Sequence, residues 1–253
     1  MSGKGRVAWV TGGGTGIGLA TVEMLAARGW TVAVTSRRAE NVEAAVRSAA
    51  ASGGDSARLM AVPLDVSDAT AVEAAAQKIV GAYGRVDLLV NSAGVNVRAR
   101  NWPDVTTEGW DQVIGINLDG LMYCMRAVLP TMRAQREGTI VNVSSWAGKY
   151  VSPLTGPAYC ASKHAVVALT HSFNMENCKD NLRACCVCPG EVATPILKSR
   201  PVVPSDEDMA RMLQAEDVAS AIVYVAEAPQ HVCLNEIVIS PTWNRSFLTN
   251  AGP

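Results

Sequence analysis

The chain has 253 residues, enough for one large α/β domain with a substantial core. Its 22 Lys and Arg residues nearly balance its 23 Asp and Glu residues, which argues against a nucleic acid or an anionic membrane as a main partner. No apolar run approaches the ~20 residues that span a bilayer, and residues 1–6 lead into a strand without room for a signal peptide. We therefore expect a cytoplasmic protein.

Strand-like and helix-like segments alternate along the chain without an obvious linker or long repeat. Short apolar or alternating runs predict seven strands, at about 7–10, 31–35, 59–64, 87–90, 139–143, 182–188 and 236–239. Helices are predicted at about 17–28, 40–51, 68–83, 107–135, 157–178 and 215–228.

This alternation of near-continuous apolar strands with helices predicts the fold class. We expect a single α/β domain over residues 1–253, with a Rossmann-like, doubly wound and mostly parallel seven-stranded sheet and helices on both of its faces. Ligands of such folds bind at the carboxyl ends of the strands.

The cysteines and histidines do not indicate a metal site. The chain has an odd number of cysteines, seven, and its 3 histidines are scattered. Cys185, Cys186 and Cys188 crowd one segment, but its small apolar residues are typical of a buried strand, and free cysteine is often buried. Structural disulfides are not expected in a reducing compartment.

A glycine-rich turn at residues 11–18 follows the first predicted strand and opens the first predicted helix. Gly12, Gly16 and Gly18 lack a Cβ, so a pyrophosphate can approach the backbone N–H groups at the helix N-terminus. Glycines can also merely supply a positive φ in a turn. The strand–turn–helix context favours dinucleotide binding.

Tyr159 and Lys163 are four positions apart in a predicted helix, so their side chains project from the same face. An ammonium there favours the phenolate of a phenol whose ordinary pKa is about 10. The pair can then donate and accept a proton near neutral pH. The alternative is an ordinary half-buried helix face, which the glycine turn and the upstream pair Ser144-Ser145 disfavour.

The glycine turn, the serine pair and the Tyr-x-x-x-Lys motif, in that order, resemble the short-chain dehydrogenase/reductase family. The glycines match its Thr-Gly-x-x-x-Gly-x-Gly pattern, and the likeness runs through residues 189–194 to all but about the last dozen residues. Segment 240–245 departs from the Asp-Gly-Gly that often ends the family's last strand, and its role is open.

The resemblance implies four catalytic residues. Tyr159 acts as general acid in reduction and as base in oxidation, while Lys163 lowers the pKa of Tyr159 and binds the nicotinamide ribose. Ser145 polarises the substrate carbonyl, with Ser144 as the alternative. Asn117 holds a water in the proton relay to Lys163, although an asparagine in a helix can also form only local hydrogen bonds.

The end of the second strand bears on the choice between NADP(H) and NAD(H). Ser36 stands where NAD-preferring relatives carry Asp. The Arg37 guanidinium can form bidentate hydrogen bonds to the 2′-phosphate of NADP(H). The alternative is that Arg37 and Arg38 are solvated surface charges. Thr15 stands where many NADP-specific relatives carry a basic residue, which counts against NADP(H). We expect NADP(H) to be favoured over NAD(H).

The resemblance also implies the remaining cofactor contacts. Asp65-Val66 corresponds to the adenine contact, residues 91–94 to an element beneath the cofactor in which Asn91 can be structural, and Thr194 to the carboxamide region. The full expected set is Gly12, Thr15, Gly16, Ile17, Gly18, Ser36, Arg37, Arg38, Asp65, Val66, Asn91, Ala93, Gly94, Tyr159, Lys163, Pro189, Gly190, Val192 and Thr194.

Three segments are expected to line the substrate pocket: 95–100, 146–153 and 191–203. An apolar wall for a ring or short alkyl group is predicted from Trp146, Tyr150, Val151, Val192, Ile196 and Leu197. Arg98 and Arg100 can receive a substrate carboxylate or phosphate, but we interpret them as exposed loop arginines that do neither. Glu191 is interpreted as a charge that repels anionic substrates.

The sequence therefore predicts an NADP(H)-dependent oxidoreductase that interconverts a ketone or aldehyde and an alcohol, acting on a small molecule. By resemblance, the helices at 107–135 and 157–178 form the dimer surface of a homodimer or homotetramer. The alternatives are a cofactor-binding sensor or scaffold without turnover, and a sugar-nucleotide epimerase or dehydratase.

Overall fold

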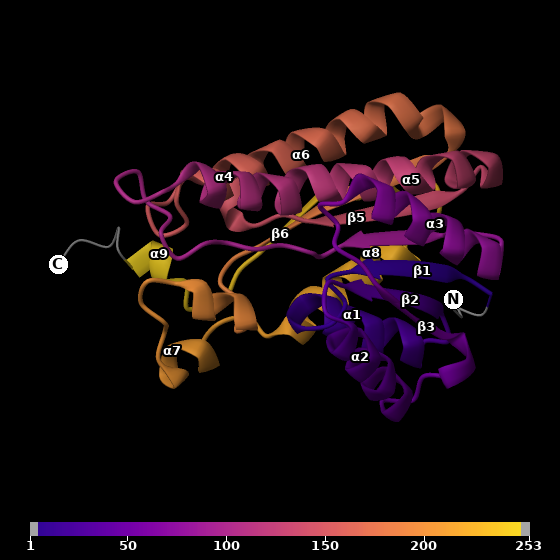
Figure 1. The fold of residues 1–253 in the computed structure, drawn as a ribbon, viewed down its shortest axis with the longest axis horizontal. Coiled ribbons are helices and arrows are strands. Elements are labelled where there is room, and N and C mark those ends of the chain that lie inside the picture. Colours follow the sequence, from indigo (N-terminus) through magenta and orange to yellow (C-terminus); the bar gives the residue numbers. More distant parts are fainter. Residues whose placement is uncertain (1–4, 249–253) are drawn as a thin grey trace.

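The computed structural model describes residues 5–248 and contains one seven-stranded sheet of order β3-β2-β1-β4-β5-β6-β7 (Figure 1). Every neighbouring pair of these strands is parallel. The strands are β1 (Val7–Thr11), β2 (Thr31–Ser36), β3 (Leu59–Pro63), β4 (Leu88–Asn91), β5 (Gly138–Val143), β6 (Leu182–Pro189) and β7 (Glu236–Ile239). The predicted Rossmann-like fold class is confirmed.

The helices cover both faces of the sheet, as the alternating sequence predicts. They are α1 (Gly16–Ala27), α2 (Ala39–Ala51), α3 (Ala69–Tyr83), α4 (Thr107–Ile114), α5 (Gly120–Gln135), α6 (Pro157–Asn177), α7 (Asp206–Ala210), α8 (Ala215–Glu227) and α9 (Arg245–Leu248). Figure 1 shows α3, α5 and α6 on one side of the sheet and α1 and α2 on the other. The short helices α7 and α9 were not predicted.

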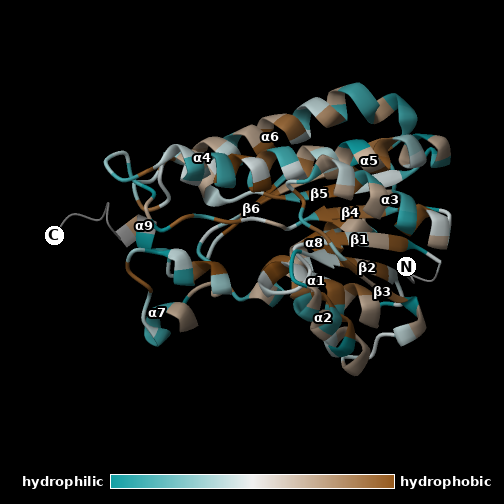
Figure 2. Ribbon diagram, in the orientation of Figure 1, coloured by the Kyte–Doolittle hydropathy of each residue, from teal (hydrophilic) through white to brown (hydrophobic). Residues whose placement is uncertain are grey.

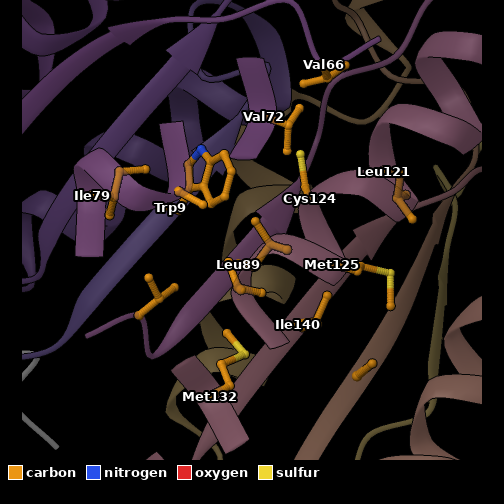
Figure 3. Close-up of a cluster of buried hydrophobic side chains, with 14 of the residues drawn as sticks. Trp9, Val66, Val72, Ile79, Leu89, Leu121, Cys124, Met125, Met132 and Ile140 are labelled. Atoms are coloured by element: carbon orange, nitrogen blue, oxygen red, sulfur yellow. The ribbon is translucent and has the colours of Figure 1, made fainter. Parts of the chain in front are cut away.

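Two hydrophobic clusters, one on each face, hold the helices to the sheet. One cluster joins β1 and β4 to α3, α5 and α6 and includes Trp9, Ile79, Leu89 and Met132, all completely buried (Figure 3). The other joins the strands to α1, α2 and α8. Figure 2 shows the strands as the most hydrophobic layer, as expected of a sheet buried on both faces.

The helix predicted at 107–135 is continuous but not uniform. Its middle is a π-helical turn, Gly115–Asp119, between α4 and α5. By length and composition this helix could cross a membrane. In the fold, α5 instead buries Leu121, Val128 and Met132 against the sheet and α3. It is therefore a core helix here.

The cysteines of β6 alternate between the two faces of the sheet. Cys185 belongs to the cluster that contains α1 and α8, whereas Cys186 and Cys188 face the cluster that contains α5 and α6. No group of three or more His, Cys, Asp or Glu side chains that could hold a metal ion occurs within residues 5–248.

The chain adds strands to both sides of β1. It passes from β1 through β2 to β3 on one side, and then crosses to β4 on the other side of β1. Such a switch point opens a crevice at the carboxyl ends of the two central strands. The glycine turn follows β1 and residues 92–94 follow β4, so both segments lie at this crevice.

Candidate active site

The glycine turn is shaped for close approach of an anionic group. Gly12 and Gly16 adopt positive φ angles of 64° and 55°. A Cβ on Gly12 would lie 2.7 Å from the Ala93 nitrogen, and one on Gly18 would lie 2.8 Å from the Gly12 carbonyl carbon. Helix α1 begins after Thr15 with no side-chain cap and no acidic residue in its first turn. This uncapped N-terminus fits a pyrophosphate.

The segment after β6 lies across the glycine turn. A Cβ on Gly16 would meet the Thr194 methyl carbon at 3.2 Å, so Thr194 borders the turn directly. The Gly190 N–H donates to the Ile239 carbonyl at 2.7 Å, which fixes the segment to β7 after Pro189 ends β6. Val192 is buried. Ile17, in the first turn of α1, packs against the same cluster as Val192.

The second strand ends beside the glycine turn. A Cβ on Gly14 would lie 2.8 Å from the Ser36 hydroxyl oxygen, and Arg37 and Arg38 after it are exposed. Asp65 accepts hydrogen bonds from the Ser67 hydroxyl at 2.7 Å and the Ser67 N–H at 3.0 Å. These bonds lower the pKa of Asp65, and the nearby Arg37 guanidinium adds to the effect.

Asn91 joins the central strands beneath the crevice. Its side-chain amide donates to the Asn142 side-chain oxygen Oδ1 at 2.9 Å, and the Asn142 side-chain amide donates to the Thr170 hydroxyl at 2.9 Å. Asn91 is 2% exposed, so this network links β4, β5 and α6 inside the fold. Val66, after β3, is also buried, against Gly120 at the start of α5.

Lys163 points into the crevice from α6. Its Nζ lies 5.5 Å from the centroid of the Tyr159 ring and donates to the Val143 carbonyl at 2.9 Å. A Cβ on Gly94 would lie 3.6 Å from both the Lys163 Nζ and the Asn117 Oδ1, so the three residues converge. Burial lowers the pKa of Lys163 to about 8.

The two adjacent serines have different environments. The Ser144 hydroxyl is buried and donates to the Lys163 carbonyl at 2.8 Å. Ser145, which follows β5, accepts from the Ala147 N–H at 3.1 Å and hydrogen-bonds Tyr159. The structure therefore brings Ser145, and not Ser144, to the tyrosine hydroxyl.

The pKa of Tyr159 reflects opposing influences. Removal from water raises it above the ordinary value for a phenol, while the Ser145 hydrogen bond and the Arg200 and Arg100 charges lower it to a lesser degree. The phenol is therefore protonated at neutral pH.

Asn117 lies in the π-helical turn and is completely buried. Its side chain donates to the Val95 carbonyl at 3.0 Å and accepts from the Val95 N–H at 2.8 Å. It also donates to the Ser162 hydroxyl at 3.2 Å. Asn117 thus ties the loop after β4 to α6, one residue before Lys163.

Comparison with known proteins agrees with this geometry. The family model described as short chain dehydrogenase matches residues 6–202. The chain belongs to the short-chain dehydrogenase/reductase family. The family model spans the glycine turn, the serine pair and the Tyr-x-x-x-Lys motif.

Individual family members align over nearly their whole lengths. The 3-oxoacyl-[acyl-carrier-protein] reductase FabG of Thermotoga maritima is 33% identical over 240 residues, 93% of this chain and 96% of that protein. A metagenomic short-chain oxidoreductase, solved in complex with NADP, has a TM-score of 0.82 at 30% identity, covering 96% of this chain and 99% of that one. Levodione reductase has a TM-score of 0.86 at 27% identity, covering 94% and 96%. This short-chain dehydrogenase/reductase is accordingly an oxidoreductase of a family that uses NAD(P).

In this family member Arg100 is buried, contrary to the prediction from the sequence. The sequence predicted two exposed loop arginines, but only Arg98 is exposed, while Arg100 is 6% exposed. Its guanidinium donates to the carbonyls of Val97, Leu154 and Ser199. Burial was not predictable, because it results from three loops closing on one another.

Glu191 carries a charge that is paired within the fold. It accepts a hydrogen bond from Arg200 at 2.8 Å and two from Arg245 at 2.8 and 2.6 Å. These two guanidinium groups outweigh the burial of Glu191 and hold its pKa below the ordinary value. The pairing of Glu191 with two guanidinium groups does not support the prediction that its charge repels anionic substrates.

The predicted apolar wall is only partly assembled. Val192 and Leu197 are turned into the core, whereas Tyr150, Val151 and Ile196 are exposed. The Trp146 ring makes edge-to-face contacts with the Tyr150 ring, at a centroid separation of 5.2 Å, and with the Phe247 ring, at a centroid separation of 5.4 Å. Phe247, in α9 just after the atypical segment 240–245, was not predicted as part of the site.

Proposed function

We propose that this chain is an NADP(H)-dependent oxidoreductase that interconverts a ketone or aldehyde of a small molecule and the corresponding alcohol. The observation that carries the proposal is the grouping of Ser145, Tyr159 and Lys163 at the crevice that the glycine turn borders. Membership of the short-chain dehydrogenase/reductase family supports the reaction class.

The cofactor would be held by segments that meet at the crevice. The uncapped N-terminus of α1 would receive the pyrophosphate, and Thr194 and Lys163 would border the nicotinamide half. Absence of a carboxylate at Ser36 and the exposed guanidinium of Arg37 favour NADP(H) over NAD(H). When bound, the nicotinamide supplies the hydride in reduction and accepts it in oxidation.

The proton is handled by the chain's own residues. In reduction the Tyr159 hydroxyl donates its proton to the substrate oxygen, and in oxidation the phenolate accepts it. The raised pKa supports the donor role at neutral pH, because the phenol is then protonated. The Ser145 hydroxyl, bonded to Tyr159, orients the substrate oxygen toward the same proton.

Lys163 and Asn117 are proposed to support the proton transfer. The Lys163 ammonium, on the face of the Tyr159 ring, favours the phenolate and binds the nicotinamide ribose. Asn117 fixes the loop after β4 beside Lys163 and holds the water through which the proton is exchanged.

Oxidation of NADPH and NADH, measured across a diverse carbonyl panel, tests the proposal. Tyr159→Phe should reduce turnover by ~10²–10⁴-fold and leave NADPH binding nearly intact, because only the proton donor is lost. Tyr224→Phe is the matched control, since Tyr224 is 65% exposed on α8. Wild-type-like turnover in Tyr159→Phe would reject the mechanism. Tight NADPH binding with no turnover on any carbonyl would favour the sensor or scaffold.

We further propose that the chain is a single-domain, cytoplasmic homodimer or homotetramer that pairs through the α4–α5 and α6 faces. The exposed Trp110 on α4 and Met175 on α6, the latter 82% exposed, support pairing of these faces. Light scattering with Met175→Glu should show dissociation toward smaller species, and an unchanged mass would reject this surface.

A further inference from the structure

We propose that Arg100 is a positioning residue for the proposed reaction: its buried guanidinium fastens three pocket loops together and favours the phenolate form of Tyr159. The inference rests on the proposed function, because it assigns Arg100 an effect on the proton transfer at Tyr159.

The first observation is the position of Arg100 at the meeting point of the loops. Its Nε donates to the Val97 carbonyl at 2.7 Å within its own loop. One terminal nitrogen donates to the Leu154 carbonyl at 3.5 Å, and the other to the Ser199 carbonyl and, at 3.2 Å, to the Ser199 hydroxyl. These partners are 54 and 99 positions away in the sequence. One side chain therefore connects the loops after β4, β5 and β6.

The second observation is the close contact between Arg100 and the start of α6. Gly156, the residue before α6, has a φ of 75° and is buried. A Cβ on Gly156 would lie 2.9 Å from the Arg100 carbonyl carbon and 3.0 Å from the Arg100 Cβ. Tyr159 is in the first turn of the same helix. The backbone that carries Tyr159 is thus packed directly on Arg100.

The third observation is the unbalanced charge. Arg100 has only carbonyl and hydroxyl partners among its hydrogen bonds within residues 5–248, and no carboxylate is among them. Arg200, in contrast, is paired with Glu191 at 2.8 Å. An arginine cannot release its proton in a protein, so a positive charge remains buried here. A buried charge without a counter-ion is costly, and an anion nearby offsets part of that cost.

The phenolate of Tyr159 is such an anion. Five neighbouring groups act on Tyr159: Ser145 after β5, Cys160 and Lys163 on α6, Arg100 after β4 and Arg200 after β6. Removal from water raises the pKa of Tyr159, and the Arg100 charge is one of the influences that lower it. Burial and the Arg200 charge lower the pKa of Arg100, and the charge of Tyr159 raises it.

The test is the pH dependence of kcat/KM for alcohol oxidation with saturating NADP⁺, in which Tyr159 must be deprotonated. Arg100→Met should move the acid limb of the profile, on which kcat/KM rises as Tyr159 is deprotonated, to higher pH. At a fixed pH on the acidic side of that limb, kcat/KM should be roughly three- to tenfold lower than in the wild type, because less phenolate is present. Arg100→Lys keeps the charge and should keep the limb near the wild-type pH. Should Arg100→Met fail to fold, Arg100→Gln replaces it, since Gln retains an amide donor for the loop carbonyls.

Arg47→Met is the control, because Arg47 is an exposed arginine on α2, outside the three segments expected to line the pocket. Its profile should equal that of the wild type. An unmoved limb in Arg100→Met, with changes confined to KM or thermal stability, would overturn the proposal and leave a purely structural arginine. Turnover retained in Tyr159→Phe would instead reject the proposed function, so that the two failures are distinguishable.

Discussion

Glu191 and Arg245 are 54 positions apart and are joined by two hydrogen bonds of 2.6 and 2.8 Å. Arg245 also reaches Asp208 at 3.3 Å, and Phe247 contacts the Trp146 ring next to Ser145. The C-terminal segment, which departs from the family pattern, is therefore fastened to the segment after β6 and to the edge of the candidate site.

Removal of the Arg245 guanidinium should loosen this attachment. Arg245→Met leaves Glu191 with Arg200 as its remaining partner, and we expect a loss of about 1 kcal/mol in the free energy of unfolding, because Arg245 is itself about one-third exposed. Urea denaturation measures the change. Arg47→Met, an exposed arginine on α2, is the control and should leave the midpoint unchanged. Equal midpoints for the two variants would show that the attachment contributes nothing to stability.

The cofactor preference should depend on Arg37. Arg37→Asp places a carboxylate where a 2′-phosphate would bind, so the ratio of kcat/KM for NADPH to that for NADH should fall by about tenfold or more. Arg47→Asp changes the net charge equally at a distant position on α2 and should preserve the ratio. Steady-state kinetics with both cofactors provides the measurement, and an unchanged ratio in Arg37→Asp would reject this role.

Two glycine substitutions should have opposite effects. Gly18→Ala introduces a methyl group against the Gly12 carbonyl, so we expect weaker NADPH binding and a loss of about 1–3 kcal/mol in stability. Gly81 lies in α3 with nothing within 4 Å of an added Cβ, so Gly81→Ala should gain about 0.5–1 kcal/mol. Thermal denaturation and fluorescence titration with NADPH report both effects. Stability gained in Gly18→Ala would contradict the tight turn.

The buried Lys163 should make stability depend on pH in the alkaline range. Its folded pKa of about 8 lies below the ordinary 10.5, so between these values the unfolded chain holds a proton that the folded chain has released. The free energy of unfolding contributed by Lys163 therefore rises with pH across this window, by at most about 3 kcal/mol, and is lost as the pH falls toward 8.

Urea denaturation of the wild type and of Lys163→Met at pH 7.5 to 10 isolates this contribution. The stability of the wild type relative to the variant should increase over the range, because Met does not titrate. Parallel curves for the two proteins would mean that Lys163 keeps an ordinary pKa despite its burial.

The sequence by itself determined the sheet and the positions of its motifs. All seven strands occur within one or two residues of their predicted ranges, because apolar runs and turn residues are local signals. Tyr159 and Lys163 share a face of α6 because four residues make about one helical turn. The glycine turn lies at the crevice because it follows the central strand β1.

Only the tertiary structure decided which neighbouring residues enter the site and which polar side chains are buried. The sequence favoured Ser145 over Ser144 only by its match to the family pattern, whereas the direction of the chain after β5 turns Ser144 to the Lys163 carbonyl and Ser145 to Tyr159. The burial of Arg100 and the Glu191–Arg245 contact depend on loops that meet across 54 to 99 positions. Such contacts form only where loops that are far apart in the sequence meet at the surface of the folded sheet. No local pattern of residues predicts them.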